Sequence, residues 1–295
     1  MQSADFLSAV FFYLKVGENL NQNWIVENLN NAFSTWNGKL GELWGLVTTG
    51  PQTFKGGAVW SVMQTLHNGM VGIGYALVVL FFAISLCKNT MNFHELKRPE
   101  AAIHYFLRFV AAKTLVGYGM DIMLNVFSIC NGIVTDMADS MGGISEAMVS
   151  LPAEMQTAIE NVGFLASIPL WLVTILGSLF LTVLSFVMIL TVYGRFFRLY
   201  MYTALAPLPL AAFAGESTQS VGISFLKSYV GVCLEGAVIV LACVIYSAFV
   251  STPTVASGEA TTIVWSYLAE TVFNMLVLVG LIKGSDRIIH EMMGL

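Results

Sequence analysis

The sequence predicts an all-α integral membrane protein. Residues 161–194 contain no charged side chain, and this run exceeds the roughly 20 residues that a helix needs to cross a bilayer. Composition agrees, because 57% of the residues are hydrophobic and only 11% are charged, which is outside the usual range of soluble domains. We therefore expect one polytopic membrane domain that follows a more polar N-terminal region.

Five apolar segments are long enough to span a hydrocarbon core of ~30 Å as helices. They are residues 59–87, 115–135, 164–193, 223–250 and 262–282. We assign them to a membrane domain that covers residues 58–295. In residues 1–57, apolar side chains such as Ile25, Leu29 and Phe33 recur at helical spacing. This spacing predicts an amphipathic N-terminal helical region that is external or lies at the membrane interface.

The distribution of Lys and Arg sets the orientation of these segments. Ten of the 13 basic residues fall on one side of the five-span arrangement, and the positive-inside rule makes that side cytoplasmic. The N-terminus is then expected outside and the C-terminus inside. The connection at residues 136–162 becomes an external loop, which carries acidic residues and neither Lys nor Arg.

A proline-broken segment at residues 199–215 separates the third and fourth spans. Pro207 and Pro209 lack the backbone N–H groups that a helix needs, and the segment is short for a crossing, reaching only ~24 Å as a helix. A crossing here would also invert the orientation of the next two connections. We therefore expect a re-entrant or interfacial segment that other helices enclose, because irregular backbone at membrane depth must be shielded from lipid.

Arg195 and Arg198 lie where the third span ends, three residues apart and thus on one helix face. One interpretation is that they anchor the helix by extending to lipid phosphates. The other is that they contact a partner protein or the phosphates of a passing nucleic acid, together with Lys227. Both interpretations predict exposed guanidinium groups.

Three acidic residues lie inside predicted spans, namely Asp121, Glu235 and Glu270. An ionised carboxylate at membrane depth is costly unless it is paired or hydrated, so we expect all three to face the interior of the bundle. They either form hydrogen bonds and ion pairs between helices or belong to an ion or proton pathway. The basic residues that we consider for pairing are Arg108, Lys113 and Lys227.

The sequence offers no set of residues typical of catalysis or cofactor binding. The four histidines lack metal-ligand spacing, and residues 280–285 contain a lysine beside a glycine without the full phosphate-binding motif. The four cysteines lie in or beside apolar segments and are interpreted as small buried side chains. We therefore predict a non-enzymatic protein without a cofactor or a metal.

Glycines in the first and last spans are typical of closely packed membrane helices. They are Gly69, Gly72, Gly74, Gly280 and Gly284. The sequence therefore predicts contacts between helices at these faces, either within one chain or between copies of the chain.

One junction in the sequence resembles a known family. The stretch Arg195-Phe196-Phe197-Arg198 leads into Ala204-Leu205-Ala206-Pro207-Leu208-Pro209 and is followed by Ser224-Phe225-Leu226-Lys227. With five spans, an external N-terminus and an acidic external loop, this pattern resembles the TrbL-type polytopic subunit of type IV secretion and conjugation systems. The resemblance covers residues 59–293.

The resemblance implies an oligomeric channel or scaffold subunit in the bacterial cytoplasmic membrane. Its implied partners are cytoplasmic ATPases, other secretion subunits, further copies of itself and membrane lipids, with single-stranded DNA and its relaxase as the substrate in transit. An alternative is a secondary transporter or ion channel that uses the intramembrane acids. Transporters often consist of two related halves with paired broken helices, and this sequence has one broken segment and no internal repeat.

The topology can be tested with single cysteines at Ser145 and Ser257, which lie in the two predicted external connections. An impermeant thiol reagent should label both positions in intact cells, because neither connection carries a basic residue that would retain it inside. Labelling at either position only after lysis would contradict the five-span orientation.

Overall fold

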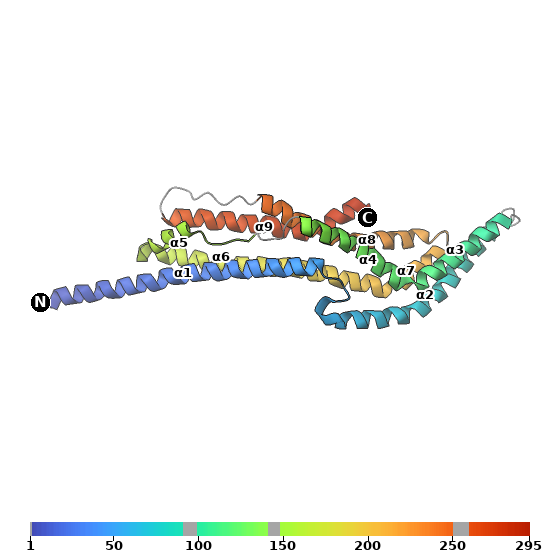
Figure 1. The fold of residues 1–295 in the computed structure, drawn as a ribbon, viewed down its shortest axis with the longest axis horizontal. Helices are drawn as coiled ribbons and strands as arrows, with labels where there is room; N and C mark the ends of the chain where they lie inside the picture. Colours follow the sequence, from blue (N-terminus) through green and yellow to red (C-terminus); the bar gives the residue numbers. More distant parts are fainter. Residues whose placement is uncertain (1, 91–98, 141–147, 250–259) are drawn as a thin grey trace. The chain divides into compact units, whose positions relative to one another are not determined.

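The computed structural model describes residues 2–90, 99–140, 148–249 and 260–295 (Figure 1). Every regular element in these ranges is a helix, so the all-α prediction is confirmed. Part of the predicted external loop, with Ser145, and the position of Ser257 lie outside the described residues. In chain order the elements are α1 (Gln2–Thr48), η1 (Phe54–Gly57), α2 (Ala58–Thr90), α3 (Pro99–Gly117), α4 (Gly119–Ser140), α5 (Ala153–Glu160), α6 (Phe164–Leu205), α7 (Pro207–Ala211), η3 (Ala212–Ala214), α8 (Gln219–Phe249) and α9 (Ala260–Met293).

Four of the described helical segments are long and apolar enough to cross a membrane. They are Phe54–Lys88, Ser167–Leu205, Gln219–Ala248 and Thr262–Met293, and they match the predicted segments 59–87, 164–193, 223–250 and 262–282. The predicted segment 115–135 is not among the four. It is divided between α3 and α4 at Tyr118, and α4 carries Asp121 in its first turn.

The chain forms two compact units. The first contains residues 1–45, 141–191 and 241–283, and the second contains residues 46–140, 192–240 and 284–295. Helices α1, α6, α8 and α9 contribute residues to both units. Each unit is therefore described by itself.

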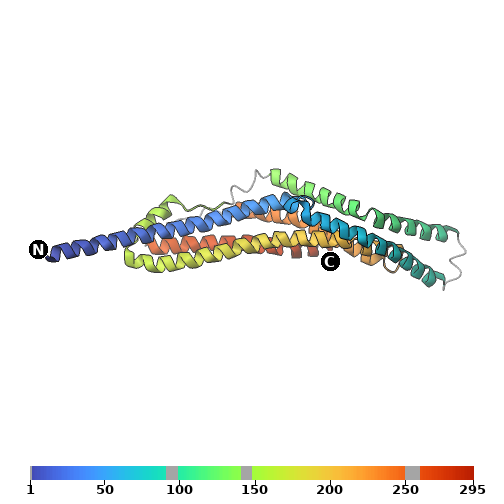
Figure 2. The same ribbon diagram turned by 90° about the horizontal axis from the view of Figure 1, so that it is seen from below.

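In the first unit, α1 packs lengthwise against α6. The Trp24 and Trp171 rings stack with centroids 5.7 Å apart, and the Lys39 Nζ lies 5.8 Å from the centroid of the Phe186 ring. The same number of residues separates the two contacts on each helix, so α1 and α6 run parallel and in register here (Figure 2). The apolar side chains predicted to share a face of α1 form the buried side of this contact. They include Ile25, Leu29, Phe33 and Trp36, and the buried Leu40 and Leu43 continue the same face.

An extended segment at residues 148–152 is fixed to this unit by side chains. The Asn37 amide donates to the Val149 carbonyl at 2.8 Å and accepts from the Val149 N–H at 2.9 Å. The Tyr267 hydroxyl donates to the Ser150 carbonyl at 3.0 Å. These bonds satisfy backbone groups that have no strand or helix partner, and α5 begins directly after Pro152.

The second unit encloses the proline segment. Helix α6 continues to Leu205, so the break begins at Ala206, later than the predicted start at residue 199. Ala206, Leu210 and Ala211 belong to a buried core that includes residues of α2, α3, α4 and α8. A proline fits at the first position of α7 because that position needs no N–H donor. Helix α7 can therefore begin at Pro207, two residues after α6 ends at Leu205.

Pro207 leaves the carbonyl of Thr203 without its helical donor. The Nδ1 atom of buried His67, in α2, lies 2.7 Å from that carbonyl oxygen, and the contact is a hydrogen bond when Nδ1 carries the proton. Helix α2 approaches the segment closely here: a Cβ at Gly74 would lie 2.9 Å from the carbonyl oxygen of Pro207. The sequence predicts the break in the helix. It does not predict that His67 lies against the freed Thr203 carbonyl, because that contact depends on the fold.

Candidate functional site: a buried ion-pair cluster

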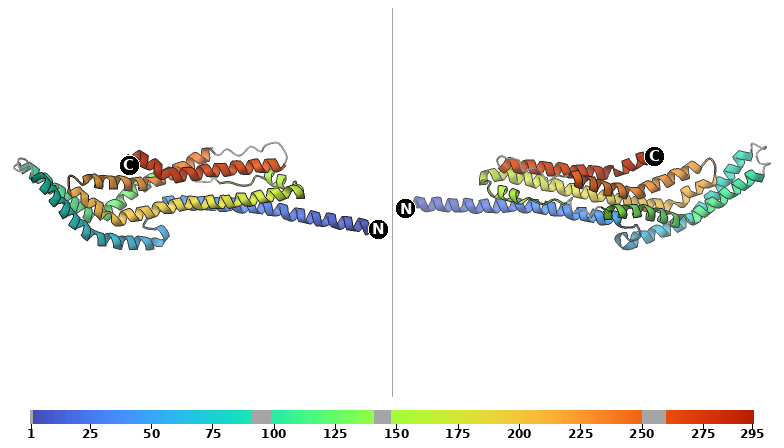
Figure 3. Two further views of the ribbon diagram at one scale, coloured as in Figure 1. Left: turned by 180° about the vertical axis from the view of Figure 1, so that it is seen from behind. Right: turned by 45° about the horizontal axis from the view of Figure 1, so that its top comes forward.

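Arg195 and Arg198 lie in the part of α6 that belongs to the second unit. Helices α6, α8 and α9 run beside one another in the ribbon views (Figure 3). Because the two arginines share a face of α6, both project toward these neighbours. The site is assembled from α6, α8, α9 and the last residues of α1.

The Arg195 side chain is fully buried. Its Nε donates to the Val232 carbonyl at 3.3 Å and its Nη2 donates to the Cys233 carbonyl at 3.1 Å, both in α8. The guanidinium also lies 6.0 Å from the centroid of the Phe127 ring in α4. Carbonyl dipoles and an aromatic ring therefore take the place of water around this charge.

The end of α1 supplies a third contact to Arg195. Nη1 donates to the Val47 carbonyl at 3.4 Å, and α1 ends at Thr48. The last carbonyls of a helix have no partner within it and carry a partial negative charge, so a cation is favourable there. Gly236 leaves the room for this guanidinium, since a Cβ at that position would lie 2.8 Å from its Cζ and both Nη atoms.

Arg198 connects two acidic residues from different helices. Its Nη2 lies 2.7 Å from both carboxylate oxygens of Glu235 in α8, and its Nη1 donates to Oδ1 of Asp286 in α9. Ser285 Oγ donates a further hydrogen bond to Glu235 Oε1 at 3.3 Å. Glu235 is 1% exposed and the Arg198 side chain is 28% exposed.

Arg195, Arg198, Glu235 and Asp286 form what we call the ion-pair cluster. Two guanidinium groups and two carboxylates balance in charge, which lowers the cost of burying each of them. His290 adds a weaker contact at the edge, with Nε2 3.6 Å from Asp286 Oδ1. The cluster holds segments of α1, α6, α8 and α9 together through charge-assisted hydrogen bonds.

The expectation of exposed arginines is wrong for this chain. Arg195 has no exposed surface, and about a quarter of Arg198 is exposed. The reason is that partners for both charges exist inside the protein, so the side chains do not need to reach lipid phosphates or water. Lys227, the third predicted contact residue, is exposed.

The three intramembrane acids have different environments. Glu235 faces the interior as expected, but its partner is Arg198 rather than one of the three basic residues considered from the sequence. Asp121 and Glu270 are exposed, which corrects the expectation that they face the interior. Asp121 lies at the start of α4 and lines a polar cleft with Gln52 and Asn131, so its carboxylate is not surrounded by apolar side chains.

Sequence reasoning missed Asp286, a member of the cluster, and Gly236, which leaves room for the Arg195 guanidinium. Asp286 is an acid between the basic residues Lys283 and Arg287 at the end of the last span, and this charge pattern could have indicated a partner for the arginines. No sequence signal indicates Gly236. In the part of the chain that the structure describes, no group of three or more His, Cys, Asp or Glu side chains could hold a metal ion.

Comparison with known proteins identifies a matching family. The sequence model of the TrbL/VirB6 plasmid conjugal transfer like proteins matches residues 36–207. The matched region extends from the last third of α1 through α6 to Pro207, and it includes Arg195 and Arg198. No curated protein and no solved structure matches the chain.

The contribution of the ion-pair cluster to stability can be measured by truncation. Glu235→Ala should lower the free energy of unfolding by about 3–5 kcal/mol, because it leaves buried guanidinium groups without compensation. The double variant Glu235→Met with Arg198→Met should lower the free energy of unfolding by far less than the sum of the decreases caused by the two single substitutions. Thermal unfolding in detergent is the measurement.

The exposed pair Arg287–Glu291, with side chains 85% and 66% exposed, provides the matched control. Arg287→Ala should change stability by no more than about 0.5 kcal/mol, because exposed ion pairs contribute little. If Glu235→Ala lowered the free energy of unfolding by no more than this control, the ion-pair cluster would not stabilise the packing of these helices.

Proposed function

The chain belongs to the TrbL/VirB6 plasmid conjugal transfer family, and from that premise we propose that it helps a DNA–protein substrate cross the cytoplasmic membrane as a non-enzymatic channel or scaffold subunit. Family membership makes it a subunit of a conjugal transfer or type IV secretion machine. The match over residues 36–207 is the observation that carries the proposal. The four apolar helices support a place in the membrane.

The proposed partners are the other subunits of the machine, including its cytoplasmic ATPases, with single-stranded DNA and its relaxase as the passing substrate. Arg195 and Arg198 are occupied within the chain, so we assign them to positioning helices. Lys227 is exposed near the start of α8, and we propose it as the cation that meets a partner on the cytoplasmic side. The topology with N-terminus outside and C-terminus inside is part of this proposal.

The alternative of a proton- or ion-coupled transporter has less support. Such a mechanism needs an intramembrane acid that can exchange its proton or ion. Both oxygens of Glu235 contact Arg198, and Ser285 adds a further bond. An acid held in this way is better suited to fixing helices than to exchanging a proton.

Self-association is supported by two open glycine faces. Among the described residues, no atom of another segment lies within 4 Å of where a Cβ would stand at Gly72 of α2 or Gly280 of α9. Gly74 differs, because it packs against α7 within the chain. Open glycine faces on apolar helices allow the close approach of a second helix, and we propose that the second helix belongs to another copy.

Replacing Gly72 or Gly280 with Leu should weaken the oligomer, because the added side chain separates the two helices. The mass of the complex in nanodiscs is the measurement. Gly72→Ala and Gly280→Ala are the matched controls, because a methyl group at the same position still allows close approach of a second helix. A wild-type protein that is strictly monomeric in mild detergent and in nanodiscs would contradict the proposed self-association.

Conjugation frequency in a complemented deletion strain tests the function. The deletion should abolish transfer, and Lys227→Glu should lower it at least tenfold, roughly the loss expected from reversing one charge contact. Protein in the membrane fraction should be unchanged, and Lys227→Arg is the control that keeps the charge. Normal transfer by the deletion strain would overturn the proposed function, while normal transfer by Lys227→Glu would remove only this residue from the contact.

The charge reversals Arg195→Glu and Arg198→Glu test a different property. The positive-inside rule by itself predicts that the double reversal leaves insertion intact, because other basic residues set the orientation. In the structure they place two more carboxylates beside Glu235 and Asp286. We therefore expect the double variant to lose protein from the membrane fraction together with transfer.

A further inference from the structure

Residues 24–39 of α1 lie beside a helix that is long and apolar enough to span a membrane. The contacts Trp24–Trp171 and Lys39–Phe186 hold α1 parallel to α6 over about 22 Å of helix. This stretch of α6 belongs to the candidate span Ser167–Leu205. If α6 crosses the bilayer there, residues 24–39 of α1 lie at the same level of the bilayer, which differs from the external or interfacial position expected from the sequence.

The two faces of α1 differ in polarity. Its buried face is apolar, and every exposed residue between Ile25 and Gly45 is polar or glycine. The exposed residues recur at helical spacing and lie on the face opposite the apolar one. We call them the polar strip, and they are Glu27, Asn30, Asn31, Ser34, Thr35, Gly38, Gly41 and Gly45.

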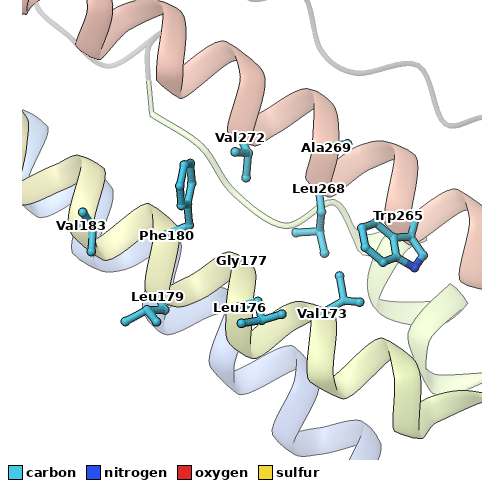
Figure 4. A pocket seen from close by; sticks show the side chains of 10 residues that line it. All are labelled: Val173, Leu176, Gly177, Leu179, Phe180, Val183, Trp265, Leu268, Ala269 and Val272. Atoms are coloured by element: carbon cyan, nitrogen blue, oxygen red, sulfur yellow. The ribbon is translucent and has the colours of Figure 1, made fainter.

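The exposed surface of α6 at the same depth is apolar. Leu179 is 60% exposed and Val183 is 51% exposed. Both residues line a groove of about 500 Å³ between α6 and α9, and the rest of its lining consists of apolar side chains and glycine (Figure 4). Trp265 lies at one end of this groove and Val272 farther along it (Figure 4). This surface is compatible with lipid acyl chains.

The polar strip is not compatible with acyl chains. Amide, hydroxyl and carboxylate groups without hydrogen-bond partners cost several kcal/mol each in hydrocarbon. In the strip, the Thr35 hydroxyl donates to the Asn31 carbonyl at 2.8 Å, and Asn30, Ser34 and Gly38 line an open polar cleft with residues 148–151. This cleft and the remaining polar side chains need water or a polar surface at membrane depth. Within the described residues the strip has open space at two of its positions, since no atom of another segment lies within 4 Å of a Cβ at Gly38 or Gly41.

We infer that the polar strip of α1 lines a water-filled space that copies of this chain enclose within the membrane. The inference rests on the proposed function, because it requires insertion of the first unit and self-association. The strip consists mostly of small or uncharged polar residues, and Glu27 is its one charged residue. Lys39 and Glu42, which flank the strip, pair with each other at 2.6 Å. Such a wall binds neither a polyanion nor a polycation tightly, so it suits a passage more than a docking site.

Single cysteines test the inference in membranes from donor cells that carry the complete machine. The parent carries Cys87→Ser, because Cys87 is exposed and the other three native cysteines are buried. Ser34→Cys and Gly38→Cys report on the strip. Leu179→Cys and Val183→Cys report on the outer face of α6 near the depth of Ser34, and they are the matched controls.

N-ethylmaleimide is the probe, and unreacted thiols are counted afterwards by gel shift. The strip positions should react roughly tenfold or more faster than the controls, since the reactive thiolate forms in water and not in hydrocarbon. Fast labelling of all four positions would place the first unit outside the bilayer and overturn the inference. Slow labelling of all four would show a dry interface at the strip and would also overturn it.

Transfer frequency is measured in the same strains. Normal transfer combined with either contradictory labelling pattern would reject the polar strip as a wet surface and leave the proposed function standing. The small substitution Ser34→Cys keeps the experiment informative if Gly38→Cys lowers the amount of protein in the membrane.

Discussion

The balance of charge around Arg195 and Glu235 is the constraint on which the second unit depends. Both side chains are almost completely buried, so neither charge has access to water. Removing one partner leaves the other charge uncompensated, which is far more costly than never having the pair. The contacts of Arg195 with Val47 and Cys233, and of Arg198 with Glu235 and Asp286, therefore fix how α1, α8 and α9 are aligned along α6.

Hydropathy predicts the long apolar helices because the cost of leaving backbone groups unpaired in lipid is a local property of each segment. Pairing between helices is not local. Arg198 and Glu235 are 37 residues apart, and Arg198 and Asp286 are 88 residues apart. A sequence shows that two arginines end a span, but it does not show which acids come within reach. For that reason the sequence places Arg195 at the end of an uncharged run, but the expectation that its side chain is exposed is wrong.

The same limit applies to α1 and to the proline segment. Helical spacing identifies the apolar face of Ile25, Leu29 and Trp36, but this spacing is the same whether the face meets lipid headgroups or another helix. Its packing along α6 follows from side-chain contacts far apart in the sequence. Likewise, the missing N–H of Pro207 predicts a break in the helix. The contact between His67 and the freed Thr203 carbonyl joins residues 136 positions apart, so the sequence does not predict it.

Polar groups in the two units are compensated in different ways, and this difference links folding to assembly. In the second unit the charges of the ion-pair cluster are compensated within one chain. In the first unit part of the polar strip lines an open polar cleft with residues 148–151, so in the proposed arrangement water and further copies of the chain supply the remaining compensation once the unit is inserted. A single inserted copy would expose amides and carboxylates to hydrocarbon at a cost of several kcal/mol each. Enclosure by further copies removes that cost, so assembly stabilises the inserted state of each subunit by mass action.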